Sequence, residues 1–516
     1  MHIRDWAKSS PDTPALIMAE SGETVTFGEM EKASNRGAQL LRSLGLKRGD
    51  AFALWSTNNA RYHEITWSMQ RSGLYMTPIA SKLKAPEAAY IVNDSGAKVL
   101  IVDAKVNHAE ALVRDIAELC PDIEHVFALQ APIGDLERWE DATAKMPDTQ
   151  IADQSAGQPM IYSSGTTGRP KGIRKELPDQ PFDEHTPPFY MALTPVEPET
   201  GYMTTAPMYH VGTLMMTLQE QQMGATIVLM EKFDPENLLK AVDKYKPKRS
   251  QFVPTMWIRI LKLPEEVRAK YDMSSLELAI HSAAPCPIKV KKAMIDWWGP
   301  ILYDIYGGTE SAGATAITSQ EWLEKPGSVG RSVQGIIRIC SDEGDELPVG
   351  ETGTIFFETD NDFSYYNDPE KTEDSRNPKH PGWRTYGDIG HIDEDGYLFL
   401  SDRRAFMIIS GGVNIFPQEA ENALILHPKV QDVAVFGVPD ADLGEVVKAV
   451  VQPVDAAEAG PDLEQELIAY CKDQLSTLKC PRTVDFENEL PRDITGKMMK
   501  KEMRDRYWKD AEAASG

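Results

Sequence analysis

Residues 162–172 read Tyr-Ser-Ser-Gly-Thr-Thr-Gly-Arg-Pro-Lys-Gly, a segment that combines hydroxyl side chains, glycines and two cations. Glycine lets the backbone come close to an anion, and hydroxyls and backbone N–H groups donate hydrogen bonds to phosphate oxygens. The spacing departs from the G-x-x-x-x-G-K-[ST] pattern, and Pro170 stands where such a loop would enter its helix. The segment is predicted to be a nucleotide-phosphate loop of another design; the bland alternative is a Ser/Gly-rich surface turn.

Alternating strand and helix patterns surround this loop over the first 400 residues. Asp234 is a good N-cap with Pro235 at the first helical position, another helix is expected from near Asn58 or Asn59, and Pro287 opens a third. This alternation predicts an α/β fold with sheets covered by helices. Short buried strands are predicted at residues 51–56, 99–102, 225–230, 251–254 and 278–281.

The pattern changes in the second half of the chain. Residues 331–357 predict a hairpin-rich β region, and the tail predicts a compact α+β unit with strands at 433–438 and 446–452. We therefore expect two domains, residues 1–401 and a small domain of residues 402–516. The acidic, proline-rich segment 176–200 is either a surface excursion or a flap near the active site.

Composition limits the function classes. At 516 residues the chain exceeds the size at which a single core keeps growing. A net charge of −25 disfavours general binding to nucleic acid or to anionic membranes. Five cysteines without a C-x-x-C spacing predict reduced thiols and no zinc site. With no signal-peptide core and no apolar run of about 18 residues, we expect a cytoplasmic protein without stable membrane insertion.

Further segments whose residues could bind a ligand or catalyse a reaction follow the loop in the chain. A Gly-Gly turn, a small-residue run or a lone lysine would each be a weak signal in isolation. The segments are His281-Ser-Ala-Ala-Pro285, Asp304-Ile-Tyr-Gly-Gly-Thr-Glu310, Tyr386-Gly-Asp-Ile-Gly390, Ser401-Asp-Arg-Arg404 and Pro491-Arg-Asp-Ile-Thr-Gly-Lys497.

In this order, the loop and these segments resemble the adenylate-forming superfamily, which contains acyl-CoA synthetases, adenylation domains and luciferases. The resemblance covers essentially the whole chain. It implies a large N-terminal adenylation domain with a β-rich subdomain and a small mobile C-terminal domain. It also implies ATP, Mg²⁺ and coenzyme A as cofactors and a small carboxylic acid as substrate, and it leaves a homodimer open.

The resemblance also assigns roles to residues. Tyr306 would stack on the purine, Asp388 would accept from both ribose hydroxyls, Thr309 would contact phosphate, and Glu310 would hold Mg²⁺. The catalytic residues are expected to be Lys497, Thr309, Glu310 and His210. The residues expected to bind nucleotide or CoA are Ser163, Ser164, Gly165, Thr166, Thr167, Gly168, Lys171, Ala283, Ala284, Pro285, Asp304, Tyr306, Gly307, Gly308, Asp388, Arg403, Ser410, Gly411 and Gly412.

These parts fit the chemistry of carboxylate activation. A carboxylate resists nucleophilic attack, and transfer of AMP to it creates a mixed anhydride with a good leaving group. Lys497 would bridge the attacking carboxylate and the α-phosphate, and it would withdraw when the small domain rotates about residues 402–405. The Ser410–Gly412 face would then line a thiol tunnel. Chain-specific departures are Ala405 and Phe406 at the hinge, and Ile409 where some aryl-CoA ligases carry lysine.

The sequence leaves alternatives open for the binding site of the CoA thiol and for the identity of the acid. Basic residues around the expected CoA entry are either a binding patch or scattered solubility charge: Arg174, Lys175, Lys479, Arg482 and Arg492. The expected acid pocket, built from residues 208–216, 251–256 and 305–308, is apolar and methionine-rich and offers no charge for an amino acid. We expect a medium-to-long fatty, alicyclic or aryl-alkyl acid. The alternatives are a cinnamate or benzoate-type acid, acyl transfer to a separate carrier protein, or a silent nucleotide-binding regulator.

Overall fold

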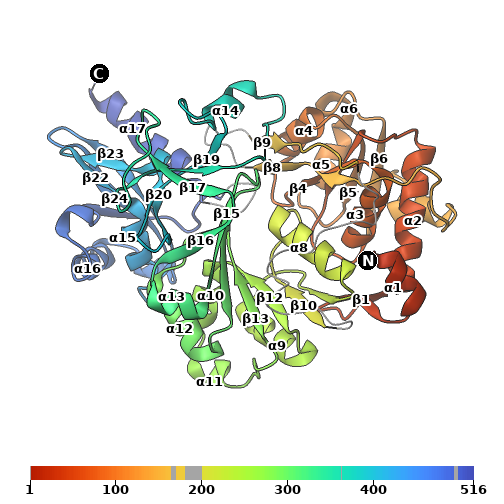
Figure 1. The fold of residues 1–516 in the computed structure, drawn as a ribbon, viewed down its shortest axis with the longest axis horizontal. Coiled ribbons are helices and arrows are strands. Elements are labelled where there is room, and N and C mark those ends of the chain that lie inside the picture. Colours follow the sequence, from red (N-terminus) through yellow and green to blue (C-terminus); the bar gives the residue numbers. More distant parts are fainter. Residues whose placement is uncertain (1, 164–169, 180–199, 362, 493–497, 516) are drawn as a thin grey trace.

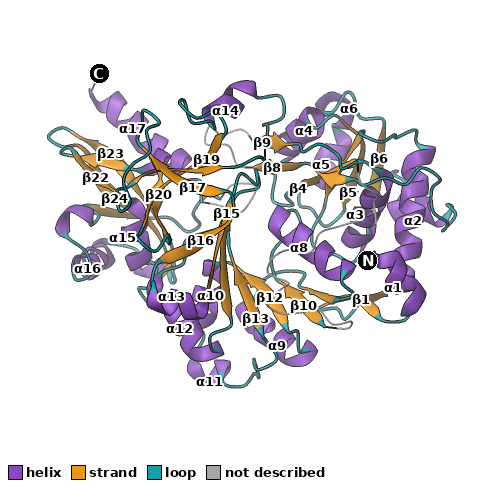
Figure 2. Cartoon of the chain, in the orientation of Figure 1, coloured by secondary structure: helices purple, strands orange, loops and turns teal. Residues whose placement is uncertain are grey.

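The computed structural model describes residues 2–163, 170–179, 200–361, 363–492 and 498–515. Figures 1 and 2 show strands and covering helices along the whole chain, with the C-terminal small sheet at one side of the molecule. Within these ranges no helix combines the length and apolarity needed to cross a bilayer. The predicted α/β class is confirmed.

The first sheet is entirely parallel and carries helices on both faces. Its strand order is β6-β5-β3-β4-β7. Along β3, Phe52 and Leu54 enter one apolar core while Ala53 and Trp55 enter the other. This double burial explains why the strand reads as a continuous apolar run. The strands are β3 (Ala51–Trp55), β4 (Tyr75–Ile79), β5 (Ala97–Asp103), β6 (His125–Leu129) and β7 (Gln158–Pro159). The helices are α1 (Ile3–Ser9), α2 (Phe27–Ser43), α3 (Arg61–Ser72), α4 (Ala85–Asp94), α5 (Ala109–Arg114), α6 (Ile116–Leu119) and α7 (Trp139–Ala144).

The parallel half of the large sheet brings several predicted site segments to one edge. From β14 the order runs β13, β12, β10, β11, β1, all parallel, and then antiparallel β2. Because the carboxyl ends of parallel strands meet at the same edge, the segments after β12, β13 and β14 emerge side by side. The strands are β1 (Pro14–Met18), β2 (Thr24–Thr26), β10 (Gly201–Thr204), β11 (Thr226–Leu229), β12 (Arg249–Phe252), β13 (Leu278–His281) and β14 (Leu302–Gly307). The helices are α8 (Val211–Gln222), α9 (Pro235–Tyr245), α10 (Pro254–Leu261), α11 (Glu265–Arg268) and α12 (Ile288–Trp298).

The antiparallel half of the same sheet continues from β14 through β15, β16, β20, β19 and β18 to β17. It contains the expected hairpin-rich region, and the β19–β20 register places Asp388 opposite Arg403. Arg403 therefore ends a strand of the large sheet. The elements are β15 (Ala314–Thr318), β16 (Ser328–Gln334), β17 (Ile336–Cys340), β18 (Gly353–Glu358), β19 (Trp383–Ile392), β20 (Leu398–Arg403), α13 (Ser319–Glu324) and α14 (Pro369–Asp374).

A short antiparallel ribbon carries the predicted phosphate loop. Its arms are β8 (Ile161–Ser163) and β9 (Lys171–Ile173), with Ile161 opposite Ile173 and Ser163 opposite Lys171. Figure 1 shows the ribbon next to β19 and α14. A bridge between Ile173 and Tyr365 fixes one arm of the ribbon to the segment before α14.

The C-terminal part forms a separate five-stranded sheet with its own apolar core. The main order is β22-β21-β24-β23, and β25 pairs with β24 in parallel. The strands are β21 (Ile408–Ser410), β22 (Val413–Ile415), β23 (Val430–Asp440), β24 (Gly444–Pro453) and β25 (Thr483–Phe486). The helices are η2 (Arg404–Phe406), α15 (Pro417–Leu424), η3 (Ala456–Glu458), α16 (Pro461–Lys472), η4 (Thr477–Lys479) and α17 (Lys500–Ser515).

Candidate active site

Tyr306 and Arg403, near the ends of β14 and β20, meet Asp388 in the middle of β19. The Tyr306 hydroxyl donates to Asp388 Oδ2 at 2.8 Å, and Arg403 Nε lies 3.2 Å from Asp388 Oδ1. Burial and the nearby Asp388 carboxylate raise the pKa of Tyr306 well above its ordinary value, so the phenol stays a neutral donor. Each carboxylate oxygen has a second acceptor position, so Asp388 retains capacity for two further hydroxyl donors.

Glu310 is held by an aromatic hydroxyl that the sequence had not indicated. Tyr365 donates from its hydroxyl to Glu310 Oε1 at 2.8 Å. On the other side, a Cβ added at Gly308 would lie 2.7 Å from Glu310 Oε2 and 2.5 Å from Tyr386 Cε1. Only glycine fits at position 308 without displacing both neighbours. Tyr386 is itself fixed, since its hydroxyl donates to the Gly313 carbonyl at 2.8 Å and accepts from the Gly313 N–H at 2.9 Å.

The donor set around Glu310 is compatible with the predicted Mg²⁺. Mg²⁺ keeps several waters and binds through one or two carboxylates plus substrate phosphates, rather than in an all-protein cage. The described ranges contain no group of three His, Cys, Asp or Glu side chains arranged around a metal position. A single half-buried carboxylate at Glu310, linked through Tyr365 to the β9 arm of the phosphate loop, fits that mode of binding. Thr309 lies half-buried beside it.

Most of the phosphate loop lies outside the described residues. Ser164, Gly165, Thr166, Thr167 and Gly168 lie outside the described residues, and Ser163 ends β8.

Lys171 was expected to present its charge to phosphate. The structure instead pairs its Nζ with Asp368 Oδ2 at 2.6 Å, and the Lys171 side chain is only 12% exposed. The hydrogen bond from Lys171 lowers the pKa of Asp368. Lys171 therefore anchors the second arm of the loop in this structure.

Asp304 differs from its predicted place in the nucleotide site. Its carboxylate is buried, with Oδ2 accepting from Lys291 Nζ at 2.8 Å and Oδ1 lying 2.8 Å from His281 Nδ1. Burial alone would favour the neutral acid, but His281 and Lys291 outweigh it and hold the pKa of Asp304 well below its usual range. Trp257 stacks on His281 with ring centroids 5.0 Å apart. The carboxylate thus ties β13, β14 and α12 together instead of standing free for a nucleotide.

Ala283, Ala284 and Pro285 are exposed directly after the carboxyl end of β13. Ala283 adopts φ +75°, a left-handed conformation that non-glycine residues adopt at a cost of about 1–3 kcal/mol. Such strain is concentrated at binding sites and turns that the surrounding structure enforces. Gly307, at the end of β14, is exposed at the same edge of the sheet.

The predicted acid-pocket segments converge from different elements. His210 precedes α8 and lies half-buried, with its ring centroid 4.7 Å from that of Tyr209. An apolar cluster on β13, β14 and β15 packs against methionines at and just after α8. Its members are Leu278, Ile280, Tyr303 and Ala316, with Met216, Met223 and Ile305 packed against them. Met216 and Ile305, which come from two of the three predicted segments, therefore pack against one apolar cluster, and the acid pocket itself stays a prediction.

The small-sheet residues form a tight hairpin. Ser410 is buried at the end of β21, and Gly411 and Gly412 make the turn with φ +56° and +80°. Ile409 and Val413 stand exposed on the two strands of this hairpin. Lys497 lies outside the described residues.

The basic residues considered for a CoA entry each have a partner within the protein. Arg174 lies between two rings, with its guanidinium carbon 4.1 Å from the Tyr75 ring centroid and 5.2 Å from that of Tyr366. The remaining cations each have a polar partner in this structure. The pairs are Lys175 with Ser311, Lys479 with Glu419, Arg482 with Asp440, and Arg492 with Asp432.

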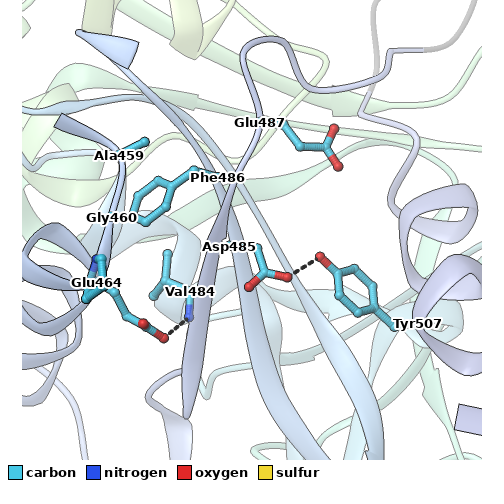
Figure 3. A pocket seen from close by; sticks show the side chains of 9 residues that line it. Ala459, Gly460, Glu464, Val484, Asp485, Phe486, Glu487 and Tyr507 are labelled. Carbon is cyan, nitrogen blue, oxygen red and sulfur yellow. Dashed lines mark hydrogen bonds between the residues drawn. The ribbon is translucent and has the colours of Figure 1, made fainter. Parts of the chain in front are cut away.

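A cavity of about 570 Å³ lies in the small sheet, between β25, α16 and α17 (Figure 3). Its acidic side chains are used internally: Glu464 accepts from the Val484 N–H at 2.9 Å, and Asp485 accepts from the Tyr507 hydroxyl at 2.6 Å. None of the predicted site residues lines it. The cavity therefore adds nothing to the candidate site.

Comparisons with known proteins find relatives along nearly the whole chain. The AMP-binding enzyme family matches residues 3–366, and the AMP-binding enzyme C-terminal domain matches residues 419–497. The long-chain-fatty-acid–CoA ligase FadD13 of Mycobacterium tuberculosis is 30% identical over 98% of this chain and 97% of its own. A feruloyl-CoA synthase of Amycolatopsis sp is 32% identical over 97% of both chains. The crystal structure of the anthranilate CoA ligase AuaEII with anthranoyl-AMP superposes with a TM-score of 0.82 at 25% identity, covering 99% of this chain and 97% of that one.

Proposed function

The chain belongs to the AMP-binding enzymes, and we propose that it is an ATP-dependent acid–CoA ligase that works through an acyl-AMP intermediate. The observation that carries this proposal is the joint placement of Asp388, Tyr306 and Arg403 with the Glu310–Tyr365 pair. Asp388, in the first group, offers acceptors suited to the hydroxyls of a ribose. The other offers a carboxylate suited to a metal-bound triphosphate, beside the arms of the phosphate loop.

In the first half-reaction, a carboxylate oxygen of the acid attacks the α-phosphorus of ATP, and the bond to the bridging oxygen breaks to release pyrophosphate. Tyr306 and the strained Ala283 segment flank the adenine, and Asp388 orients the ribose. Lys497 balances the charge that develops between carboxylate and α-phosphate. Mg²⁺ held by Glu310 would neutralise charge on the departing pyrophosphate.

In the second half-reaction, the CoA thiolate attacks the acyl carbonyl and AMP leaves with the electron pair of the C–O bond. The Ser410–Gly412 turn would line the thiol's path after the small domain, residues 402–516, has rotated. This division of the chain and the role of Lys497 rest on the resemblance to the family. A cytoplasmic location is proposed from the sequence pattern, and a homodimer stays open.

The acid is proposed to be hydrophobic. Met216, Met223 and Ile305 pack against the apolar faces of β13 and β14, and methionine adapts to chains and rings alike. The similarity to FadD13 supports a fatty acid as the substrate. The similarity to feruloyl-CoA synthase supports an aryl acid. A cinnamate or benzoate-type acid is therefore the second candidate, and acyl transfer to a separate carrier protein is the third.

The test is pyrophosphate release from Mg-ATP across a panel of acids, run with and without CoA. The panel contains C2 to C18 fatty acids, benzoate, cinnamates, a steroid acid and amino acids. We expect CoA-stimulated turnover with hydrophobic acids and none with amino acids. Release that CoA does not stimulate would favour another acceptor, and silence with every acid would contradict the proposal.

A further inference from the structure

Tyr365 belongs to a segment that connects the phosphate loop to Glu310. We propose that Tyr365 is a positioning residue that orients the Glu310 carboxylate for the metal of the bound nucleotide. This inference rests on the proposed function, because it assigns Glu310 to Mg-ATP. Tyr365 acts through Glu310 and is not itself placed against the reacting atoms.

The ring of Tyr365 is fixed from several sides. Its hydroxyl reaches Glu310 Oε1 at 2.8 Å, and Phe363 packs edge-on with ring centroids 5.5 Å apart. Its backbone N–H donates to Thr372 Oγ1 at 2.9 Å, and the residue forms a bridge to Ile173 of β9. A donor held in this way can restrict the carboxylate before any ligand arrives.

Glu310 is confined from the opposite side as well. Its Oε2 occupies the space that a side chain at position 308 would fill. The carboxylate thus lies between the Tyr365 hydroxyl and the backbone of Gly308. A long acidic side chain has considerable rotamer freedom to lose on binding a cation, and these two restraints remove part of that freedom in advance.

The same segment joins Glu310 to the loop. Tyr366 N–H donates to the Gly172 carbonyl at 2.8 Å, and Asp368 pairs with Lys171 at 2.6 Å. Residues 365–368 therefore contact both the second arm of the phosphate loop and the proposed metal ligand. Such a connection fixes the carboxylate relative to the arm that leads into the loop.

The experiment compares Tyr365→Phe with the wild type. The substitution removes the hydroxyl and keeps the ring. One hydrogen bond to a charged group is worth about 10-fold in an equilibrium constant. We expect the concentration of Mg²⁺ that half-saturates acid-dependent pyrophosphate release to rise about 10-fold, with kcat at saturating Mg²⁺ within about 3-fold. Mn²⁺ binding in the presence of ATP, followed by electron paramagnetic resonance, should weaken by a similar factor.

Tyr366→Phe is the matched control. It makes the same change at the neighbouring residue, whose ring lies over Arg174 and not at Glu310. It should leave the Mg²⁺ dependence and Mn²⁺ binding unchanged. Thermal unfolding of ligand-free Tyr365→Phe should match the wild type, which separates positioning from loss of fold.

A double-mutant cycle with Glu310→Gln completes the test, because residues that act through each other are not additive. Tyr365→Phe should add no further loss of Mn²⁺ binding in the Glu310→Gln background. Unchanged Mn²⁺ binding in Tyr365→Phe alone, or full additivity in the cycle, would overturn the inference. A wild type that binds Mn²⁺-ATP but releases no pyrophosphate with any acid would instead count against the proposed function.

Discussion

At the residue scale, the sequence proposed many residues for the site but could not indicate their partners. Their roles stay predictions, but Gly308, Glu310 and Asp388 could be proposed from short motifs, because that reasoning needs only local chemistry. The engagement of Lys171 by Asp368 could not, because that contact joins residues far apart in the chain. Asp304 is similar: its motif suggested a nucleotide ligand, and only the packing of α12 brings Lys291 onto it.

The sequence around Tyr365 contains one weak indication of an ordered loop. It stands in the run Tyr365-Tyr-Asn-Asp-Pro369, in which Asp368 caps α14 and Pro369 begins it. A helix start of this kind marks a loop with defined geometry. Nothing in the run indicates that the Tyr365 hydroxyl would reach Glu310.

Gly308 gives the sharpest prediction at this scale. In Gly308→Ala, the new Cβ would approach Tyr386 Cε1 to 2.5 Å and Glu310 Oε2 to 2.7 Å, so both must move. We expect kcat/KM for adenylation to fall at least about 10-fold, with a stability cost of about 1–3 kcal/mol. Pyrophosphate release and urea unfolding measure the two effects. The control is Gly382→Ala, where the added methyl meets nothing within 4 Å.

At the element scale, predictions succeeded where the signal was local. Asp234 caps α9 through the N–H groups of Glu236 and Asn237, with Pro235 first in the helix, as expected. The helix expected from Asn58 or Asn59 begins at Arg61, because Asn59 accepts from the Arg61 N–H and stays outside the helix. The strand β14 extends to Gly307 and includes Asp304 and Tyr306, although the sequence indicated no strand there. Its antiparallel pairing with β15 supplies the additional length.

The link between β9 and the segment before α14 is also testable. Asp368→Asn keeps the helix cap but removes the charge that pairs with Lys171, which is 12% exposed. We expect the KM for ATP to rise about 3- to 10-fold, since charge-assisted hydrogen bonds contribute about 1.5–3 kcal/mol when well shielded. Lys171→Met should have an effect of similar size, and the double variant should be no worse than either single one. Additive losses would mean that Lys171 acts on the nucleotide independently of Asp368.

The helix α3 contains a buried acid, Glu64, that should make the free energy of unfolding depend on pH. Burial raises the pKa of Glu64 from 4.5 to about 7, against the opposing effect of Arg61 at 2.7 Å. Between these two pH values the native state holds a proton that the unfolded state has released. Stability therefore falls as pH rises from about 4.5 to about 7, by roughly 3 kcal/mol at most.

Glu64→Gln removes this titration. The urea midpoint of this variant should depend less on pH between 4.5 and 7, because the contribution of Glu64 is gone. At pH 8 the midpoint of the variant should be higher than that of the wild type. Glu23→Gln, which removes the exposed second carboxylate on Arg61, should keep most of the slope, because burial and not Glu23 is the largest cause of the raised Glu64 pKa. An identical slope in wild type and Glu64→Gln would contradict the assignment.

At the scale of the whole molecule, the sequence correctly predicted the α/β class, the family and the type of reaction. It could not predict how strands distant in the chain align, although that alignment builds the site. The register that sets Asp388 opposite Arg403 and the position of β14 between β13 and β15 both come from sheet assembly. The boundary at residues 401 and 402 stays a prediction.

The small sheet is attached to the large one by specific contacts. Lys289 Nζ donates to Gln474 Oε1 at 2.8 Å, and Ile425 and Leu426 pack against the core that contains Trp257. Contacts of this kind fix one arrangement of the two parts. A second half-reaction with different geometry would have to break them.

The proposed division of labour makes a prediction for Lys497. Lys497→Ala should slow adenylation by at least about 10²–10³-fold, the scale of losing one donor to a developing oxyanion. Thioester formation from preformed acyl-AMP and CoA should keep its rate. Measuring the two half-reactions separately checks this, and an equal loss in both would contradict a role confined to adenylation.

The most direct test of the acid–CoA ligase assignment is identification of the products by mass spectrometry after incubation with Mg-ATP, CoA and a hydrophobic acid that supports turnover. The proposed reaction predicts acyl-CoA, AMP and pyrophosphate in equal amounts, and accumulation of acyl-AMP on the enzyme when CoA is omitted. Formation of ADP and phosphate, or of acyl-CoA without AMP, would contradict it.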